Sequence, residues 1–152
     1  MRTELAESVM ALSRVIELSG GVGTALVGLI IWLHIFIFDM SHGAQFKLRE
    51  DAPVFLMFVA PGILVAIGSY LQVRRRQGWA VAVILVGALL NIFFQGINAR
   101  LVFVLSGDIW GQRAVLVDFA LVIITISGAG INTIASASLR RRVQMKDPVD
   151  IA

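Results

Sequence analysis

Residues 79–105 read WAVAVILVGALLNIFFQGINARLVFVL, an apolar run that polar residues interrupt only between positions 91 and 100. A helix of about 20 residues crosses the ~30 Å hydrocarbon core of a bilayer, because each residue adds about 1.5 Å. Transmembrane strands would instead show segments of about 10 residues with alternating hydrophobicity. The run therefore predicts a membrane-spanning helix, and its polar interruption requires a separate explanation.

Three further apolar runs have a comparable length, at about residues 20–40, 53–73 and 114–137. The chain of 152 residues is 58% hydrophobic and 15% charged, whereas soluble domains carry about 25% charged residues. The links between the four runs are too short to form another domain. We therefore predict an all-α fold in which residues 1–152 form a single four-span membrane domain, a four-helix bundle.

Arginine and lysine are distributed unequally between the two ends of the predicted bundle. Nine lie at one end: Arg2, Arg14, Arg74, Arg75, Arg76, Arg140, Arg141, Arg142 and Lys146. The other end has Lys47, Arg49 and Arg113, with Arg100 near the membrane edge. The positive-inside rule then predicts that both termini are cytoplasmic, as in a protein of a bacterial inner membrane. The basic rim favours anionic lipid headgroups, and we expect no nucleic-acid partner.

The two ends of the chain carry their own patterns. Four apolar residues recur at helical spacing within residues 1–18: Leu5, Val9, Leu12 and Ile16. This stripe predicts a short amphipathic helix on the membrane surface, with a solvated helical extension as the alternative. Residues 138–152 are predicted to form a basic cytoplasmic tail.

The third and fourth spans each have a polar face. Helical arithmetic at about 100° per residue places three polar residues of the third span, and three of the fourth, in common directions. These six are predicted to make interhelical polar contacts: Asn91, Gln95, Asn98, Asp118, Thr125 and Asn132. Hydrogen bonds of this kind hold membrane helices together. The alternative is that these residues, apart from Thr125, line a polar path for an ion or a small solute.

The depth of each residue in the membrane predicts particular pairs. Antiparallel helices joined by a short loop normally pack together. Equal depth then pairs Asn91 with Thr125, and it pairs Asn98 with Asp118. Arg100 points away from this face, so it is expected to reach headgroups, another subunit or the outer loops.

His34 points away from the small-residue face of the first span. A neutral histidine bonded to a neighbouring helix would explain it, and so would contact with another subunit. A third interpretation is that His34 binds a cofactor as an axial ligand of haem or a chlorin, although the sequence has no paired-ligand motif. The chain has no cysteine, and no spacing of histidines and carboxylates predicts a metal site or catalytic residues.

These features favour a protein without enzymatic activity. We expect a non-catalytic accessory subunit of a larger membrane complex, of respiratory, photosynthetic or transport type, that packs against other membrane subunits and lipids. One alternative is a small homo-oligomeric transporter or channel with a polar path between the third and fourth spans. A second alternative is a haem- or chlorin-binding module that uses His34.

Overall fold

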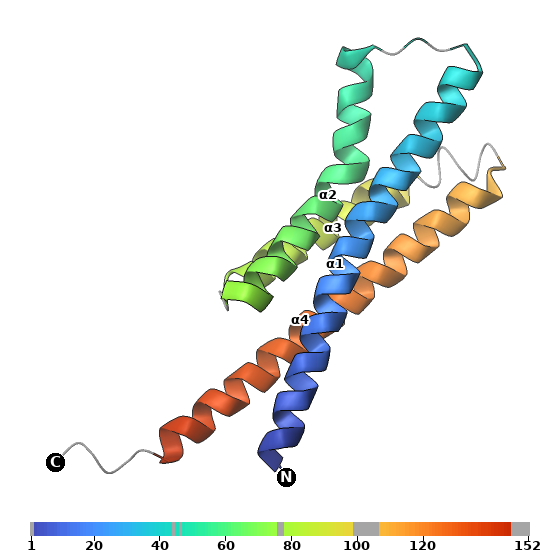
Figure 1. Ribbon diagram of the computed structural model, residues 1–152. Helices are drawn as coiled ribbons and strands as arrows, with labels where there is room; N and C mark the ends of the chain where they lie inside the picture. The colour runs from blue at the N-terminus through green and yellow to red at the C-terminus, as the bar shows by residue number, and fades with distance from the viewer. Residues whose placement is uncertain (1, 44, 46, 76–77, 99–106, 147–152) are drawn as a thin grey trace.

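The computed structural model of the protein describes residues 2–43, 45, 47–75, 78–98 and 107–146 (Figure 1). These residues form four helices: α1 (Arg2–Ser41), α2 (Leu48–Arg75), α3 (Ala80–Asn98) and α4 (Ile109–Lys146). Each helix is long and apolar enough to cross a membrane. The predicted all-α fold with four spans is therefore confirmed in length and composition. The predicted orientation of the termini stays a prediction.

Two of the helices are longer than the sequence indicated. α1 has 40 residues and α4 has 38, so at about 1.5 Å per residue each is nearly twice as long as the hydrocarbon core is thick. The prediction of a separate surface helix over residues 1–18 is wrong, because α1 continues without a break into the first span. α4 likewise continues to Lys146, into the segment predicted to be a tail.

Tertiary packing explains why α1 passes unbroken through its glycines. Gly20 lies against Thr125 and Leu121 of α4, and Gly21 lies against Ser69 of α2. Glycine disfavours a helix interior by about 1 kcal/mol relative to alanine. Here the missing side chains let two neighbouring helices approach closely, and this packing offsets the weak local propensity.

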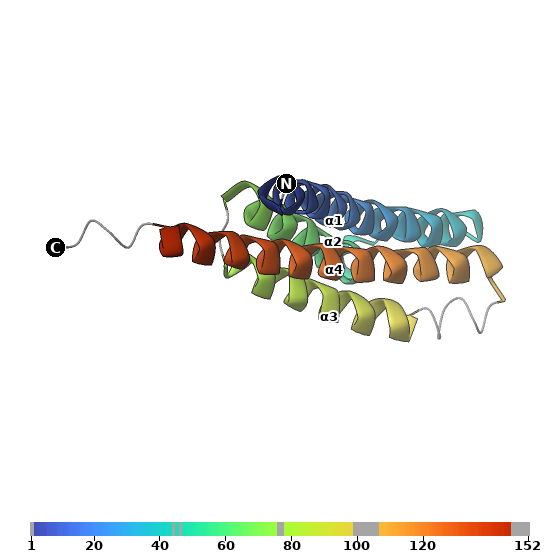
Figure 2. The same ribbon diagram turned by 90° about the horizontal axis from the view of Figure 1, so that it is seen from below.

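α1 joins α2 to α4. It packs against both α2 and α4, whereas α3 packs mainly against α2 and touches α4 only slightly. Figure 2 shows α3 on the side of the bundle opposite α1. The predicted packing of the third span against the fourth is therefore only weakly realised.

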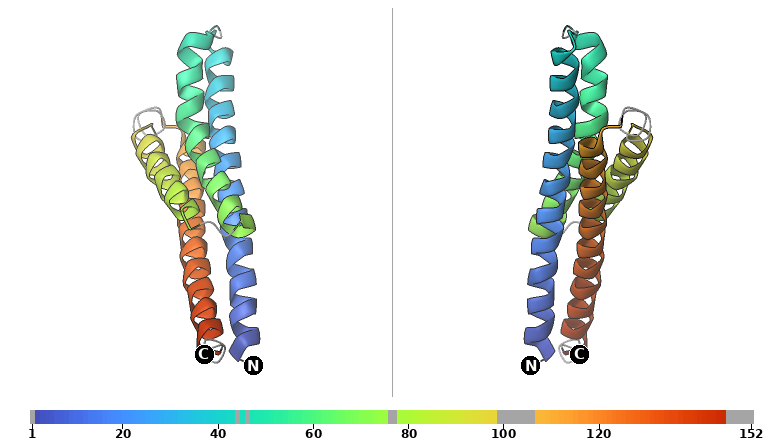
Figure 3. Two further views of the ribbon diagram at one scale, coloured as in Figure 1. Left: turned by 90° about the vertical axis from the view of Figure 1, so that its left-hand side faces the viewer. Right: turned by 90° about the vertical axis from the view of Figure 1, so that its right-hand side faces the viewer.

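The two ends of the molecule differ in shape. At the end where both termini lie, which we call the terminal end, α1 and α4 extend together past the turn between α2 and α3 (Figure 3). At the opposite end, which we call the link end, the hairpin of α1 and α2 projects furthest (Figure 1). α2 contains Pro61 in its interior and bends part-way along (Figure 1), as expected where a proline removes a backbone hydrogen bond.

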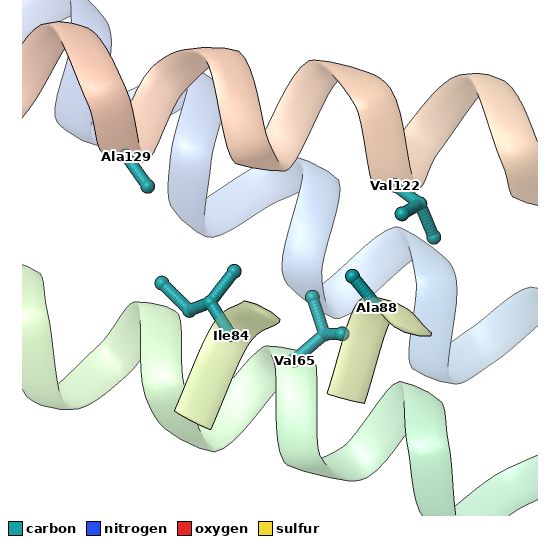
Figure 4. Close-up of a cluster of buried hydrophobic side chains, with 5 residues drawn as sticks. All are labelled: Val65, Ile84, Ala88, Val122 and Ala129. Atoms are coloured by element: carbon teal, nitrogen blue, oxygen red, sulfur yellow. The ribbon is translucent and has the colours of Figure 1, made fainter. Parts of the chain in front are cut away.

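Two apolar clusters form the core. The first lies toward the link end and contains the buried residues Ile31, Phe58, Val59 and Val115. The second lies toward the terminal end, where α2, α3 and α4 meet, and contains Val65, Ile84, Ala88, Val122 and Ala129 (Figure 4). Along α4, residues 116–121 separate the two clusters, and this interval contains Asp118.

Candidate functional site

Three polar side chains are fully buried in the interval between the apolar clusters. Asn91 and Gln95 of α3 and Asp118 of α4 have no solvent exposure. Asn91 and Gln95 are one helical turn apart, so they share a face of α3. The Asn91 amide lies close enough to act on the Asp118 carboxyl. We call these three residues the polar layer.

No polar side-chain atom of this layer has a hydrogen-bond partner. This holds for both amide atoms of Asn91, both amide atoms of Gln95 and both carboxyl oxygens of Asp118. The Asn91 amide is thus near Asp118 without meeting ordinary hydrogen-bond geometry. A buried unpaired polar group costs about 1–3 kcal/mol, and a charged one costs more. With six buried polar atoms that have no partner, the polar layer is the candidate functional site.

The donor atoms of the polar layer define which ion it fits. A carboxylate and two amide carbonyls are hard oxygen ligands, which suit alkali or alkaline-earth ions and not soft transition metals. Asp118 supplies one negative charge, which one proton or one monovalent ion neutralises. Within the described ranges, no group of three or more His, Cys, Asp or Glu residues is placed to hold a metal ion.

A second group of buried polar residues lies toward the terminal end, where α1, α2 and α4 meet. The Asn132 amide donates to Glu17 Oε2 at 3.0 Å. The Gln72 amide donates to the Ala129 carbonyl at 3.1 Å and to Thr133 Oγ1 at 3.0 Å. These bonds join three helices. Neither Glu17 nor Gln72 was among the predicted polar contacts, although Glu17 shares the glycine-rich face of α1 in the sequence.

The other predicted contact residues have different surroundings. Thr125 is buried, but its hydroxyl donates to the Leu121 carbonyl of its own helix at 2.8 Å, and it packs against Gly20. The side chain of Asn98 and all of Arg100 lie outside the described residues. The bond predicted between Asn98 and Asp118, and the headgroup or partner contact predicted for Arg100, stay predictions.

The pairing of Asn91 with Thr125 by depth is wrong, because Asn91 lies beside Asp118 instead. The reason is the packing of α3. That helix rests on α2 and has little contact with α4, so its depth follows α2. Matching residues of α3 and α4 by their distance in sequence from the link between the two helices therefore gives the wrong register.

His34 has a partner within the chain. Its Nε2 lies 2.8 Å from Asp108 Oδ2, and its ring is 4.3 Å from that of Trp110. The other carboxyl oxygen of Asp108 accepts a hydrogen bond from the Gly111 backbone N–H at 3.1 Å, so Asp108 caps the first turn of α4. Desolvation opposes the charge on Asp108, but the Gly111 N–H and His34 hold its pKa below the usual value.

The contact with Asp108 joins α1 to the beginning of α4. This arrangement accounts for a histidine that faces away from the small-residue side of its helix. Ligation of haem or a chlorin through Nε2 would require the bond between His34 and Asp108 to break. A cofactor at His34, or a subunit contact there, stays a prediction that the geometry does not favour.

Comparison of the chain with protein-family models, with curated proteins and with solved structures found no match. The site is therefore interpreted from its own geometry. The polar layer is the part of the described structure where burial and missing hydrogen bonds coincide most strongly.

Proposed function

We propose that the chain is an integral membrane protein that binds a small cation, a proton or an alkali metal ion, in the polar layer and passes it across the membrane. The observation that carries this proposal is the carboxyl group of Asp118, which is fully buried with both oxygens unpaired. An ionisable group inside a membrane bundle usually belongs to an ion pathway or a proton relay. The length and apolar character of all four helices support the membrane location.

The hydrogen-bond pattern argues against a purely structural role for the polar layer. Polar residues that hold membrane helices together do so by bonding across the interface. Such bonds join α1, α2 and α4 through Glu17, Asn132 and Gln72. The polar layer makes none with its side chains. Two groups of similar composition therefore differ in role, and the unpaired one is the candidate for ion binding.

The packing of α3 provides a means of access to the site. Because α3 touches α4 only slightly, a movement of α3 away from α4 would expose the polar layer and break few contacts between these two helices. The outer face of α3 is apolar, with Leu89 and Phe93 largely exposed. In a membrane this face contacts lipid or a second copy of the chain, as in a small homo-oligomeric transporter.

The subunit function that the sequence favoured rested partly on His34. Since His34 is bonded to Asp108 within the chain, it no longer requires a partner protein. Transport by the purified chain alone is the property that separates the two functions, because a non-catalytic subunit would have none.

The test is ion flux in liposomes that contain only this protein. A pH-sensitive dye measures proton flux, and radioactive sodium measures alkali-ion flux, so the two ions are distinguished. The variant Asp118→Asn should reduce the flux by about tenfold or more, because an amide carries no negative charge to hold a cation and cannot bind and release a proton at neutral pH. Asp39→Asn is the matched control, since Asp39 is exposed at the link end of α1. Absence of flux of either ion, or equal flux in wild type and Asp118→Asn, would refute the proposal.

A further inference from the structure

Glu17 is a second fully buried carboxyl group, and the polar layer does not include it. Its side chain has no solvent exposure. One oxygen, Oε2, accepts the bond from Asn132, whereas Oε1 has no partner. The backbone of Gly128 lies directly against Glu17, so α1 and α4 are in close contact at this point. The carboxyl is enclosed by protein and only half satisfied.

A second unpaired acceptor belongs to the same helix junction. Gln72 donates to Ala129 and Thr133, which lie on either side of Asn132, the residue that holds Glu17. The oxygen of Gln72, Oε1, has no partner, and the side chain is at least nine-tenths buried. Two oxygen acceptors, Glu17 Oε1 and Gln72 Oε1, are thus left without a donor where α1, α2 and α4 meet.

The number of free oxygens selects the ligand. Calcium takes six to eight oxygen ligands and magnesium takes six, and the junction offers two free acceptors with a buried serine, Ser69, one turn away on α2. A proton needs only one donor and one acceptor. A proton bound to Glu17 Oε1 would turn that oxygen into a hydrogen-bond donor, and a donor is what the two free acceptors lack. The junction therefore fits a proton better than a metal ion.

The charged groups around Glu17 are few. On α1, the half-buried Arg14 is near enough for its charge to act on Glu17. The residues that α2 and α4 contribute, Gln72 and Asn132, do not ionise. Arg74 and Arg75 at the end of α2 are exposed to solvent, so they form a basic rim beside the junction and not part of its interior.

The position of the junction connects it to the polar layer. Asp118, Thr125 and Asn132 are seven residues apart along α4, which places them on one side of the helix at intervals of about 10 Å. All three are buried. Glu17, held by Asn132, is therefore at the terminal end of a buried polar face whose other end is Asp118.

We propose that Glu17 is a proton-binding site at the terminal end of the pathway that contains Asp118. A proton from water at the terminal end forms an O–H bond at Glu17 Oε1, and the same bond breaks when the proton leaves toward either side. No oxidation or reduction occurs. The transfer of this proton along the pathway rests on the proposed function, whereas proton binding at Glu17 can be tested by itself.

The test uses a hydrophobic carbodiimide, which reacts with protonated carboxyl groups in membranes, on the full wild-type chain in liposomes. Peptide mass spectrometry then identifies each modified residue. Glu17 should be modified. At pH values above the pKa of its carboxyl group, the rate of modification should fall about tenfold per pH unit, as the protonated fraction does. Glu7, which is exposed on the same helix, is the internal control and should remain unmodified. Because the wild-type chain is used, no variant has to fold.

The outcomes separate this inference from the proposed function. Modification of Asp118 without Glu17 would overturn the inference and leave the proposed function standing. Modification of Glu17 without Asp118, together with no ion flux, would support the site and refute the function. Where the wild-type protein gives proton flux, Glu17→Gln should abolish both the carbodiimide labelling at position 17 and the proton flux. Glu7→Gln should leave the proton flux unchanged. Unaltered flux in Glu17→Gln would place Glu17 outside the pathway.

Discussion

At the scale of single residues, the buried polar side chains fall into two kinds. Asn132 is bonded to Glu17 across the α1–α4 interface, whereas Asp118 is buried without a partner. Removing one partner of a buried hydrogen bond leaves the other unsatisfied. Removing an unpaired buried carboxyl relieves the cost of burying it. Apolar substitutions at the two residues should therefore change the stability of the protein in opposite directions, although both residues lie on the same side of α4.

This contrast gives a prediction for stability. Asn132→Ala should destabilise the protein by about 1–3 kcal/mol, because Glu17 loses its donor. Asp118→Val should be neutral or stabilise it by about 1–2 kcal/mol, while abolishing ion flux. Thermal unfolding in detergent, followed by circular dichroism, measures both effects. If Asp118→Val destabilises the protein as much as Asn132→Ala does, then Asp118 holds the bundle together and its role as an ion site is wrong.

Residue spacing in the sequence indicates direction around a helix far better than it indicates partners. The face selected on α3 and α4 contains Asn91, Gln95, Asp118, Thr125 and Asn132, and the structure buries all five. Residue spacing could not show that the Thr125 hydroxyl bonds to its own helix. It also could not show that Asp108, in a loop, reaches His34. Partners depend on the register between helices, which side-chain packing sets.

At the scale of helices, close contacts through glycine decide how α1 and α4 pack. A Cβ atom added at Gly128 would lie 2.8 Å from the Glu17 backbone nitrogen. At Gly130, two residues further along the same helix, an added Cβ would meet nothing within 4 Å. The two glycines have similar sequence surroundings, and only the structure distinguishes them. The sequence likewise did not show that residues 2–41 form one continuous helix.

We expect Gly128→Val to destabilise the protein by about 1–3 kcal/mol or more, because the new side chain pushes α1 away from α4. Gly130→Ala, the control, should be neutral or stabilising by up to about 1 kcal/mol through helix propensity. Thermal unfolding measures both. Since Glu17 is in contact with Gly128, Gly128→Val should also disturb carbodiimide labelling of Glu17. Equal stability of the two variants would contradict the tight α1–α4 contact.

At the scale of the whole molecule, the length of α1 and α4 exceeds the thickness of a bilayer. Both helices run on past the α2–α3 turn at the terminal end (Figure 3). Apolar side chains of this extension, such as Leu5 and Leu12, are largely exposed. Four apolar runs were enough to predict the number of spans, because the hydrophobic length of a helix is a local property of the sequence. How far a helix continues past its apolar run does not follow from the length of that run.

The orientation of the bundle is the property that the distribution of charge predicts most directly. The chain has no cysteine, so single cysteines introduced at Ser41 and Gly78 can be labelled without interference. Both positions are exposed. Ser41 ends α1, before the link to α2, and Gly78 follows α2. The 28 residues of α2 span about 42 Å at ~1.5 Å per residue. Nine basic residues flank the terminal end in the sequence, and the positive-inside rule predicts that this end is cytoplasmic. In intact cells, a membrane-impermeant maleimide should therefore label Ser41→Cys, and it should label Gly78→Cys only after permeabilisation. The reverse pattern would invert the orientation and place Glu17 at the external end of the pathway, whereas labelling of both positions in intact cells would show that α2 does not span the membrane.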